Sequence, residues 1–183
     1  GERLIAPAHT STMQNRILQE LKPQLERGEP IAAAVIDRAF RNEDLDPRHE
    51  HTFYQNEGIY VSKGVNVGML VATLKTFLES YYGRELNVRL NPFYFPFTEP
   101  SFEFSLSCPF CDHGCSVCSQ TGWIELLGCG MIHPNVLQMA GIDPEVYTGF
   151  AWGVGVDRLV MMKYDIEDIR HFESAKLEFL RQF

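Results

Sequence analysis

Apolar residues recur at helical spacing in two long segments of the chain. The first covers residues 11–27, follows a candidate capping hydroxyl at Thr10 or Ser11, and ends before Gly28. The second covers residues 67–82, is followed by Gly83, and has apolar residues at positions 67, 70, 71, 74, 77, 78 and 81. We therefore predict two amphipathic helices, and we expect the second to pack on a sheet.

Other segments are rich in the β-branched and aromatic residues that favour strands. Polar residues 42–52 separate the first two of these segments and predict a long loop between antiparallel partners. Helical patterns return at 134–140 and 155–164. Because most strands precede these last helices, we predict an α+β fold, with residues 1–183 forming one domain on an antiparallel sheet. The expected strands are 31–40, 53–61, 86–92, 93–97, 102–106 and 122–130.

The composition is that of an ordinary globular protein, with 45% hydrophobic and 22% charged residues. No apolar run reaches the ~18 residues of a membrane span, and the N-terminus resembles no export signal. We therefore expect a cytoplasmic protein with no membrane partner. The formal net charge of −8 argues against a broad phosphate-binding surface, since such surfaces need clustered Lys and Arg. An RNA partner should be bound mainly by parts outside this chain.

Polar side chains on two neighbouring strands form a first candidate site. Arg41 and Glu43 are expected two residues apart on a strand and therefore on one face, as are Gln55 and Glu57 on its neighbour. Such a surface suits an anionic ligand with an amine, because arginine binds phosphate and carboxylates bind ammonium. Alternation alone explains the pattern equally well, as the solvent face of an antiparallel sheet.

Glycines mark two further places. Gly128 and Gly130 interrupt an apolar strand, which is typical of a backbone approached closely by a flat ligand, and also of a bulge or a strand end. Gly153 and Gly155 precede Arg158 at the start of a helix. Its guanidinium is suited to stacking on a planar ring, to binding phosphate, or simply to pairing with a carboxylate.

Two CxxC pairs lie within a Cys-rich insertion at about 107–120. Disulfides are unfavourable in the cytoplasm, so a structural zinc is the preferred interpretation. Because only three residues separate the pairs, fewer than in most four-cysteine sites, reduced metal-free thiols remain the alternative. The candidate ligands are Cys108, Cys111, Cys115 and Cys118, with His113 as a substitute for one of them; Cys129 is interpreted as a small buried residue.

Six short segments recur in the order and spacing of a known family. They are Arg41 with Glu43, FYQNEG, YFPFTEPSFE, GWIELLGCGMIHPNVL, GFAWGVGVDRL and FLRQF. Together they resemble the catalytic core of the phenylalanyl-tRNA synthetase alpha subunit, a class II aminoacyl-tRNA synthetase, over nearly the whole chain. The resemblance implies an antiparallel sheet flanked by helices, and a reaction in which ATP and phenylalanine form an adenylate whose acyl group passes to tRNA(Phe). It also implies Mg²⁺ and a beta-subunit partner.

The resemblance also assigns roles to single residues. Arg41, with Glu43 beside it, would contact the α-phosphate and Arg158 would clamp the ATP, which makes the two arginines the catalytic candidates. Glu99 would take part in magnesium binding together with the partner subunit. The residues expected around the amino acid are His9, Ser11, Gln55, Glu57, Phe95, Phe97, Gly128, Gly130 and Ala151.

Within that set, each group meets a different part of the amino acid. Gln55 and Glu57 would receive the substrate ammonium, and His9 and Ser11 would help to hold the amino acid and the phosphate. Phe95 and Phe97 would meet the substrate ring edge to face, an arrangement that aromatic rings prefer. Ala151 would keep the base of the ring pocket open, since a larger side chain there would exclude the substrate. The two glycines would form the floor.

Several positions depart from the pattern of the family. Tyr54 stands where the family has histidine, Trp152 where it has phenylalanine, and Ala175 and Lys176 where it has an acidic and amide pair. Two parts of the family have no counterpart: the first class II motif, which is normally the dimer interface, and the N-terminal coiled coil that reaches tRNA. Whether the chain forms a homodimer without the first motif therefore stays open. Three interpretations remain: the core of a working alpha subunit, a stand-alone paralogue that activates another amino acid or charges a non-tRNA acceptor, or a non-catalytic ligand-binding relative.

Overall fold

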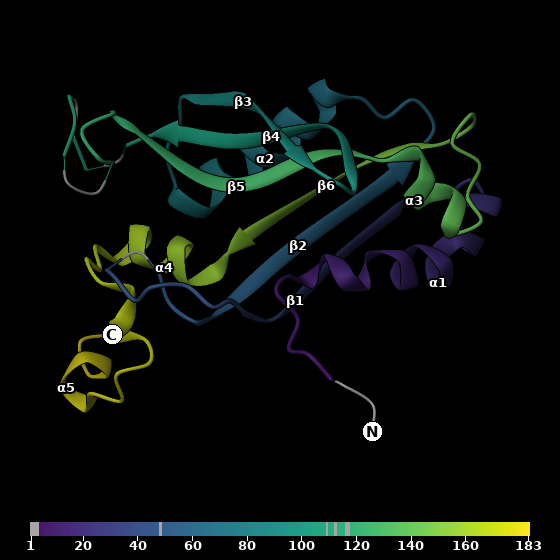
Figure 1. Ribbon diagram of the computed structural model, residues 1–183. Helices are drawn as coiled ribbons and strands as arrows, with labels where there is room; N and C mark the ends of the chain where they lie inside the picture. Colours follow the sequence, from purple (N-terminus) through teal and green to yellow (C-terminus); the bar gives the residue numbers. More distant parts are fainter. Residues whose placement is uncertain (1–3, 48, 109, 112, 116–117) are drawn as a thin grey trace.

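A six-stranded antiparallel sheet forms the centre of the structure (Figure 1). The fold is taken from a computed structural model, which describes residues 4–47, 49–108, 110–111, 113–115 and 118–183. The strand order is β1-β2-β6-β5-β4-β3, so that β1 and β3 are the edges. The strands are β1 (Ile31–Phe40), β2 (Thr52–Ser62), β3 (Val88–Phe95), β4 (Thr98–Ser107), β5 (Trp123–Ile132) and β6 (Thr148–Gly155).

Helices cover both faces of this sheet. In Figure 1, α2 (Val67–Tyr82) lies on one face, while α1 (Gln14–Glu26) and α3 (Pro134–Met139) lie together on the other. The 3₁₀ turn η1 (Thr10–Met13) precedes α1, and α4 (Val156–Tyr164), η2 (Ile169–His171) and α5 (Leu177–Leu180) follow β6. Among the helices of the described residues, none is long and apolar enough to cross a membrane.

The larger part of the core lies between α2 and the sheet. Leu70, Leu74 and Leu78 recur on one side of α2 and are fully buried against a cluster that includes Phe104 and Leu106 of β4. The helix begins where the Asn66 side chain accepts a hydrogen bond from the Met69 N–H, and it ends at Gly83, whose φ of +69° is left-handed. The predicted helix over 67–82, and its packing on a sheet, are therefore confirmed.

The smaller part of the core lies between the sheet and α1 with α3. Leu18 and Leu25 of α1 pack with Ile59 and Val61 of β2 and with Leu137 of α3. This cluster fills only one end of that face. The rest of the face carries polar and glycine residues and is left open as a cavity.

The structure corrects the predicted elements in four places. Segments 86–92 and 93–97 form one strand, β3, because an edge strand tolerates Pro92. The sequence pattern predicts no strand at β6, where glycines weaken the signal, yet pairing with β2 and β5 on both sides holds it extended. Residues 11–27 divide into η1 and α1. Finally, β1 ends at Phe40, so Arg41 and Glu43 lie in the following loop and not on a strand face.

The α2 core gives a stability test. We expect Leu74→Ala to lower the free energy of unfolding by about 2–5 kcal/mol, because it leaves a cavity at a fully buried site. Met69→Ala, on the exposed side of the same helix, should cost less than about 1 kcal/mol. Urea denaturation followed by circular dichroism measures both, and equal losses for the two variants would contradict the packing described here.

Candidate active site

A cavity of about 520 Å³ lies on the sheet face that α1 and α3 leave uncovered. Its volume falls within the range of small-ligand sites, about 300–1,000 Å³. It is lined from strands β2 to β6, the turn between β3 and β4, the loop after β1, the segment from His9 to Gln14, and the first turn of α4. Most of the expected site residues line it: His9, Ser11, Arg41, Glu43, Gln55, Glu57, Phe95, Phe97, Gly128, Ala151 and Arg158.

The floor of the cavity is set by strand register. Glu57 of β2 pairs with Gly153 of β6, Gly153 with Gly128 of β5, and Gly128 with Glu103 of β4. Paired residues of neighbouring strands point to the same face, so two glycines lie between two carboxylates in one row. At a strand spacing of about 4.8 Å the backbones of the two glutamates are roughly 14 Å apart, which suits contacts with different parts of a ligand.

One end of the row is a buried polar cluster around Glu57. Its Oε2 accepts hydrogen bonds from the hydroxyls of Ser11 at 2.6 Å and Thr10 at 3.0 Å, and its Oε1 accepts one from the Gln14 amide at 3.3 Å. Gln55 Oε1 accepts the Thr10 N–H at 3.1 Å. Ser11 and Thr10 therefore bind Glu57 and do not cap α1 with their side chains, which corrects the predicted role.

Glu57 is held without a neutralising charge. Burial raises the pKa of its carboxyl, and the three hydrogen bonds lower it by less. All three donors are neutral, and among the described residues no cationic side chain pairs with this carboxylate. A cation entering the cavity would find an acceptor already fixed in position.

Next to this cluster lies an apolar slot. The rings of Phe95 and Phe97 are stacked with centroids 5.8 Å apart and an interplanar angle of 16°. A Cβ at Gly128 would come within 2.6 Å of Phe95 Cζ, so any side chain there would displace the ring. Ala151 is buried on β6 and presents only a methyl group to the cavity. Phe95 thus fills the space directly above Gly128, and the slot is bounded by the two rings and by the Ala151 methyl group.

His9 joins the polar cluster to the slot. Its ring centroid lies 5.6 Å from that of Phe97, and its Nδ1 is buried without a hydrogen-bond partner among the described residues. Burial, and then the charge of Arg41, lower the pKa of the imidazole. His9 is therefore neutral near pH 7 and has a nitrogen available to a ligand.

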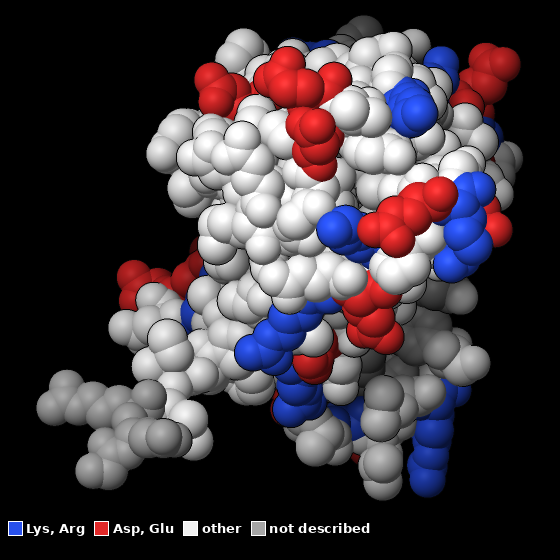
Figure 2. All heavy atoms as spheres, turned by 90° about the vertical axis from the view of Figure 1, so that its right-hand side faces the viewer, with Lys and Arg blue, Asp and Glu red and all other residues white. Residues whose placement is uncertain are grey.

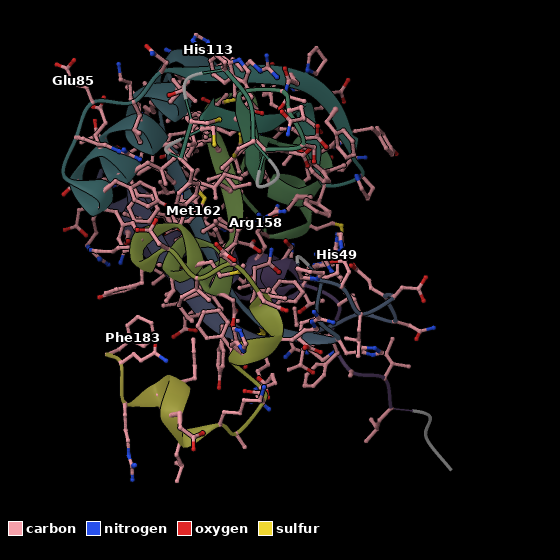
Figure 3. The ribbon with its side chains drawn as sticks, turned by 90° about the vertical axis from the view of Figure 1, so that its left-hand side faces the viewer. His49, Glu85, His113, Arg158, Met162 and Phe183 are labelled. Atoms are coloured by element: carbon pink, nitrogen blue, oxygen red, sulfur yellow. The ribbon has the colours of Figure 1, made fainter. Side chains whose placement is uncertain are left out.

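Two guanidinium groups reach the same cavity from different elements. Arg41 extends from the loop after β1, where its Nε donates to the Ala8 carbonyl at 3.2 Å and its Nη1 lies 3.8 Å from Glu43 Oε1. Its guanidinium also lies 4.9 Å from the centroid of the Phe53 ring. Arg158 lies in the first turn of α4, and its Nη1 donates to the Glu125 carbonyl at 3.1 Å. In Figure 3, Arg158 lies near the centre of the molecule, and His49, from the loop that carries Arg41, also lines the cavity.

The sequence-based prediction missed four carboxylates of the cavity: Glu50, Glu103, Glu125 and Asp157. Glu103 and Glu125 lie on adjacent strands and both line the cavity that Arg158 enters. Burial, and then the neighbouring Glu125, raise the pKa of the Glu103 carboxyl. Alternation places Glu103 on the face opposite Phe102 and Phe104, but only the register of β4 with β5 reveals that this face meets Gly128.

Gly130 and Glu99 lie outside the lining of the cavity. A Cβ at Gly130 would come 2.6 Å from the Pro100 carbonyl oxygen and 2.7 Å from Thr98 Cβ. The expectation that Gly130 forms part of the ligand floor is thus corrected, because the protein itself fills that space. The Glu99 side chain is 74% exposed, and its Oε2 lies 3.1 Å from His133 Nε2.

Trp152, which stands where the resembled family has phenylalanine, packs on the face of the sheet opposite the cavity. Its ring stacks on Phe77 of α2 at 5.4 Å and lies over Gly58, where a Cβ would overlap the indole. The two neighbours of Trp152 on β6, Ala151 and Gly153, point to the cavity. The indole therefore belongs to the α2 core, and the ring slot keeps its small floor.

The four cysteines form a separate cluster at the connection from β4 to β5. Their sulfur atoms all lie within 4.8 Å of one another, and none of the four lines the cavity. Within the predicted insertion, residues 109, 112, 116 and 117 lie outside the described residues. His113 is exposed.

The chain resembles known proteins over its whole length. The family model described as "tRNA synthetases class II core domain (F)" matches residues 1–183. The chain is 50% identical over 176 residues to the phenylalanine–tRNA ligase alpha subunit of Leptospira biflexa, a match that covers 96% of this chain and 50% of that protein. It is 47% identical to the same subunit of Moorella thermoacetica and 46% identical to that of Halalkalibacterium halodurans, over 183 residues, 100% of this chain and 52% of each protein.

The chain thus spans about half the length of the curated relatives it matches. The family match extends over all the elements that build the cavity, from η1 to α4. The six-stranded antiparallel sheet and the match along its whole length together show that the chain belongs to the class II tRNA synthetase core domain family.

Proposed function

We propose that this chain is the catalytic core of a phenylalanine–tRNA ligase alpha subunit, which activates phenylalanine with ATP and transfers it to tRNA(Phe). One observation carries the proposal. A single cavity joins an unneutralised carboxylate, a slot under two stacked rings, and two guanidinium groups. These three features match the ammonium, the side chain and the phosphate of a phenylalanyl adenylate.

The amino acid would occupy the β2 end of the cavity. Its ammonium would lie at Glu57 and Gln55, which are buried and already oriented by Thr10, Ser11 and Gln14. Its ring would enter the slot beside the two phenylalanines, over the small side chain of Ala151. A tyrosine would bring a hydroxyl into this apolar slot, and its desolvation would disfavour binding.

ATP would occupy the end of the cavity that contains the arginines. Arg41 would contact the α-phosphate, and Arg158 would hold the rest of the triphosphate or stack on the base. Arg41 is oriented by the Ala8 carbonyl and by Phe53, and Arg158 by the Glu125 carbonyl. Each guanidinium thus reaches the cavity from a fixed backbone anchor.

The reaction needs no nucleophile from the protein. The phenylalanine carboxylate attacks the α-phosphorus, a new acyl C–O–P linkage forms, and the bond to the β-phosphate oxygen breaks to release pyrophosphate. A terminal ribose hydroxyl of tRNA then attacks the acyl carbon and AMP leaves. Catalysis would rest on positioning and on neutralising the phosphate charge that develops, which is the task of Arg41 and Arg158.

Magnesium fits the end of the cavity where Glu103 and Glu125 lie. Their carboxylates are adjacent, line the cavity that Arg158 enters and supply the oxygen ligands that Mg²⁺ prefers. Bound with ATP, the ion would neutralise phosphate charge. The role predicted for Glu99 stays a prediction, since magnesium at that exposed position would draw its other ligands from the partner subunit.

The proposal also includes a beta subunit and tRNA as partners, in the cytoplasm. Figure 2 shows Lys and Arg interspersed with Asp and Glu on one face of the described chain. Together with the net charge of −8, this supports tRNA binding mainly by parts of the assembly outside this chain.

The arginines give the first test of the function. In the assembled enzyme, we expect Arg41→Ala and Arg158→Ala each to lower kcat/KM for phenylalanine-dependent pyrophosphate exchange by about 10²–10³-fold, because each removes a positioned positive charge. Arg27→Ala is the matched control, because Arg27 is exposed and pairs with Glu29 outside the cavity. Unchanged exchange in both cavity variants would contradict the proposal.

The same assay separates the alternatives. Exchange by this chain without a partner, and with an amino acid other than phenylalanine, would instead identify a stand-alone paralogue. Ligand binding without exchange in every mixture would identify a non-catalytic relative.

The unneutralised carboxylate gives a second test. Burial raises the pKa of Glu57 in the folded chain, so the folded state holds the proton more tightly than the unfolded state. The buried charge therefore destabilises the fold above that raised pKa, and the cost disappears as the pH falls below the ordinary value of about 4.3. We expect Glu57→Gln to raise the melting temperature at pH 7 without ligand, and the gain to vanish near pH 4, as measured by thermal denaturation.

The same variant should lose its response to phenylalanine. Saturating phenylalanine raises the melting temperature of the natural chain by mass action, whereas the neutral amide of the Glu57→Gln variant offers the ammonium no charge. Glu29→Gln, at an exposed position, is the control and should change neither result. A Glu57→Gln variant that is destabilised at pH 7, or that is still stabilised by phenylalanine, would disprove this role.

A further inference from the structure

The four cysteine sulfurs have the spacing of a tetrahedral metal site. Sulfur atoms at the corners of a regular tetrahedron, each about 2.3 Å from a central zinc, are about 3.8 Å from one another. The Sγ atoms of Cys108 and Cys115 are 3.8 Å apart, those of Cys115 and Cys118 are 3.8 Å apart, and those of Cys111 and Cys118 are 3.6 Å apart. All four lie within 4.8 Å of one another.

The short linker between the CxxC pairs is accommodated by tight turns. Gly114 has φ +125°, and a Cβ there would come 2.7 Å from the Gln120 carbonyl oxygen. Gln120 in turn donates its N–H to the Cys115 carbonyl at 2.9 Å. The chain therefore folds back on itself, so that each sulfur of the first pair meets a sulfur of the second. This resolves the objection that three intervening residues are too few.

The surroundings favour thiolate ligands. Cys118 Sγ accepts N–H hydrogen bonds from Cys115 at 3.1 Å and Gly122 at 3.3 Å. Such donors stabilise metal-bound thiolates. Cys108 and Cys118 are buried, while Cys111 and Cys115 are partly exposed, which leaves an entry side for a metal. His113 lies on the outside of this connection, at the top of Figure 3.

The alternatives fit the geometry less well. Sulfur separations of 3.6–3.8 Å are far from the about 2.05 Å of a disulfide bond, and two disulfides would not require all four sulfurs to converge. Metal-free thiols are weak donors and acceptors and provide little reason to gather four buried or half-buried sulfurs at one point.

We propose that Cys108, Cys111, Cys115 and Cys118 bind one Zn²⁺ as a structural tetrathiolate site that fixes the β4–β5 connection. Cys108 directly follows the end of β4, and its N–H donates to the carbonyl of Gly122, which directly precedes β5. A metal at this point would hold the two strand ends together. Glu125 is the third residue of β5, and its carbonyl accepts a hydrogen bond from the Arg158 guanidinium. The zinc thus braces the strand pair that supports one end of the cavity, and it takes no part in the reaction.

Metal content and ligand variants test the site. We expect the full-length protein, expressed with zinc, to retain about one zinc per chain by elemental analysis. Replacement by Co²⁺ should give the visible absorption of a tetrahedral thiolate site. Cys111→Ser and Cys115→Ser, at the two partly exposed ligands, should lose the metal. Cys129→Ala and His113→Ala, which alter a sulfur and an imidazole outside the four ligands, should keep it.

Hydrogen exchange in the unaltered protein tests whether the metal holds the ends of β4 and β5 together. Removal of zinc with a chelator should speed amide exchange at the connected ends of β4 and β5 more than in the β1–β2 pair, because only the former lose their metal link. A zinc-free protein from zinc-replete cells, disulfides within the cluster, or equal zinc loss in the control variants would overturn the site. Zinc loss without faster amide exchange would contradict the proposal that the metal holds the ends of β4 and β5 together. None of these readouts depends on aminoacylation, so they fail or succeed independently of the proposed function.

Discussion

The pairing register of four strands determines what this sheet can hold. Because Glu57, Gly153, Gly128 and Glu103 are successive partners, they form one row, with a carboxylate at each end and two glycines between them. The Gln55 amide packs on Gly153 and the Phe95 ring packs on Gly128. A shift of one residue on any of these strands would turn its member of the row to the opposite face. The cavity, the aromatic slot and the approach of Arg158 all depend on that register.

The cost of the site falls on a few residues, and the packing elsewhere offsets it. A buried carboxylate without a counterion and glycines in central strands both weaken a fold. The α2 face compensates with fully buried leucines against β4, while α1 and α3 close the far end of the other face. The sheet therefore has one face that stabilises the fold and another that is partly committed to a ligand.

The hydrophobic pattern of the sequence predicted the helices and strands whose own residues carry a clear helix or strand signal. The amphipathic period of α2 and the apolar strand β1 were visible in the sequence, and so was the pairing of β1 with β2. The strand β6 was not, because its glycines look like a loop until β2 and β5 are placed beside it. Within the site, residues quoted from family segments were expected in advance, whereas Glu103 and Glu125 emerged only from the pairing of β4 with β5. The space above Gly130 could not be anticipated either, because Thr98 and Pro100 fill it from a neighbouring strand.

Trp152 and Gly58 show how the two faces can evolve separately. The indole occupies the volume in which any side chain at position 58 would begin, so position 58 can gain a side chain only if residue 152 becomes smaller or moves. Their chain neighbours point the other way, toward the ligand side. Substitutions that compensate one another in volume can therefore accumulate in the packing under α2. The residues on the opposite side of the same strands, which line the cavity, are selected separately for their chemistry.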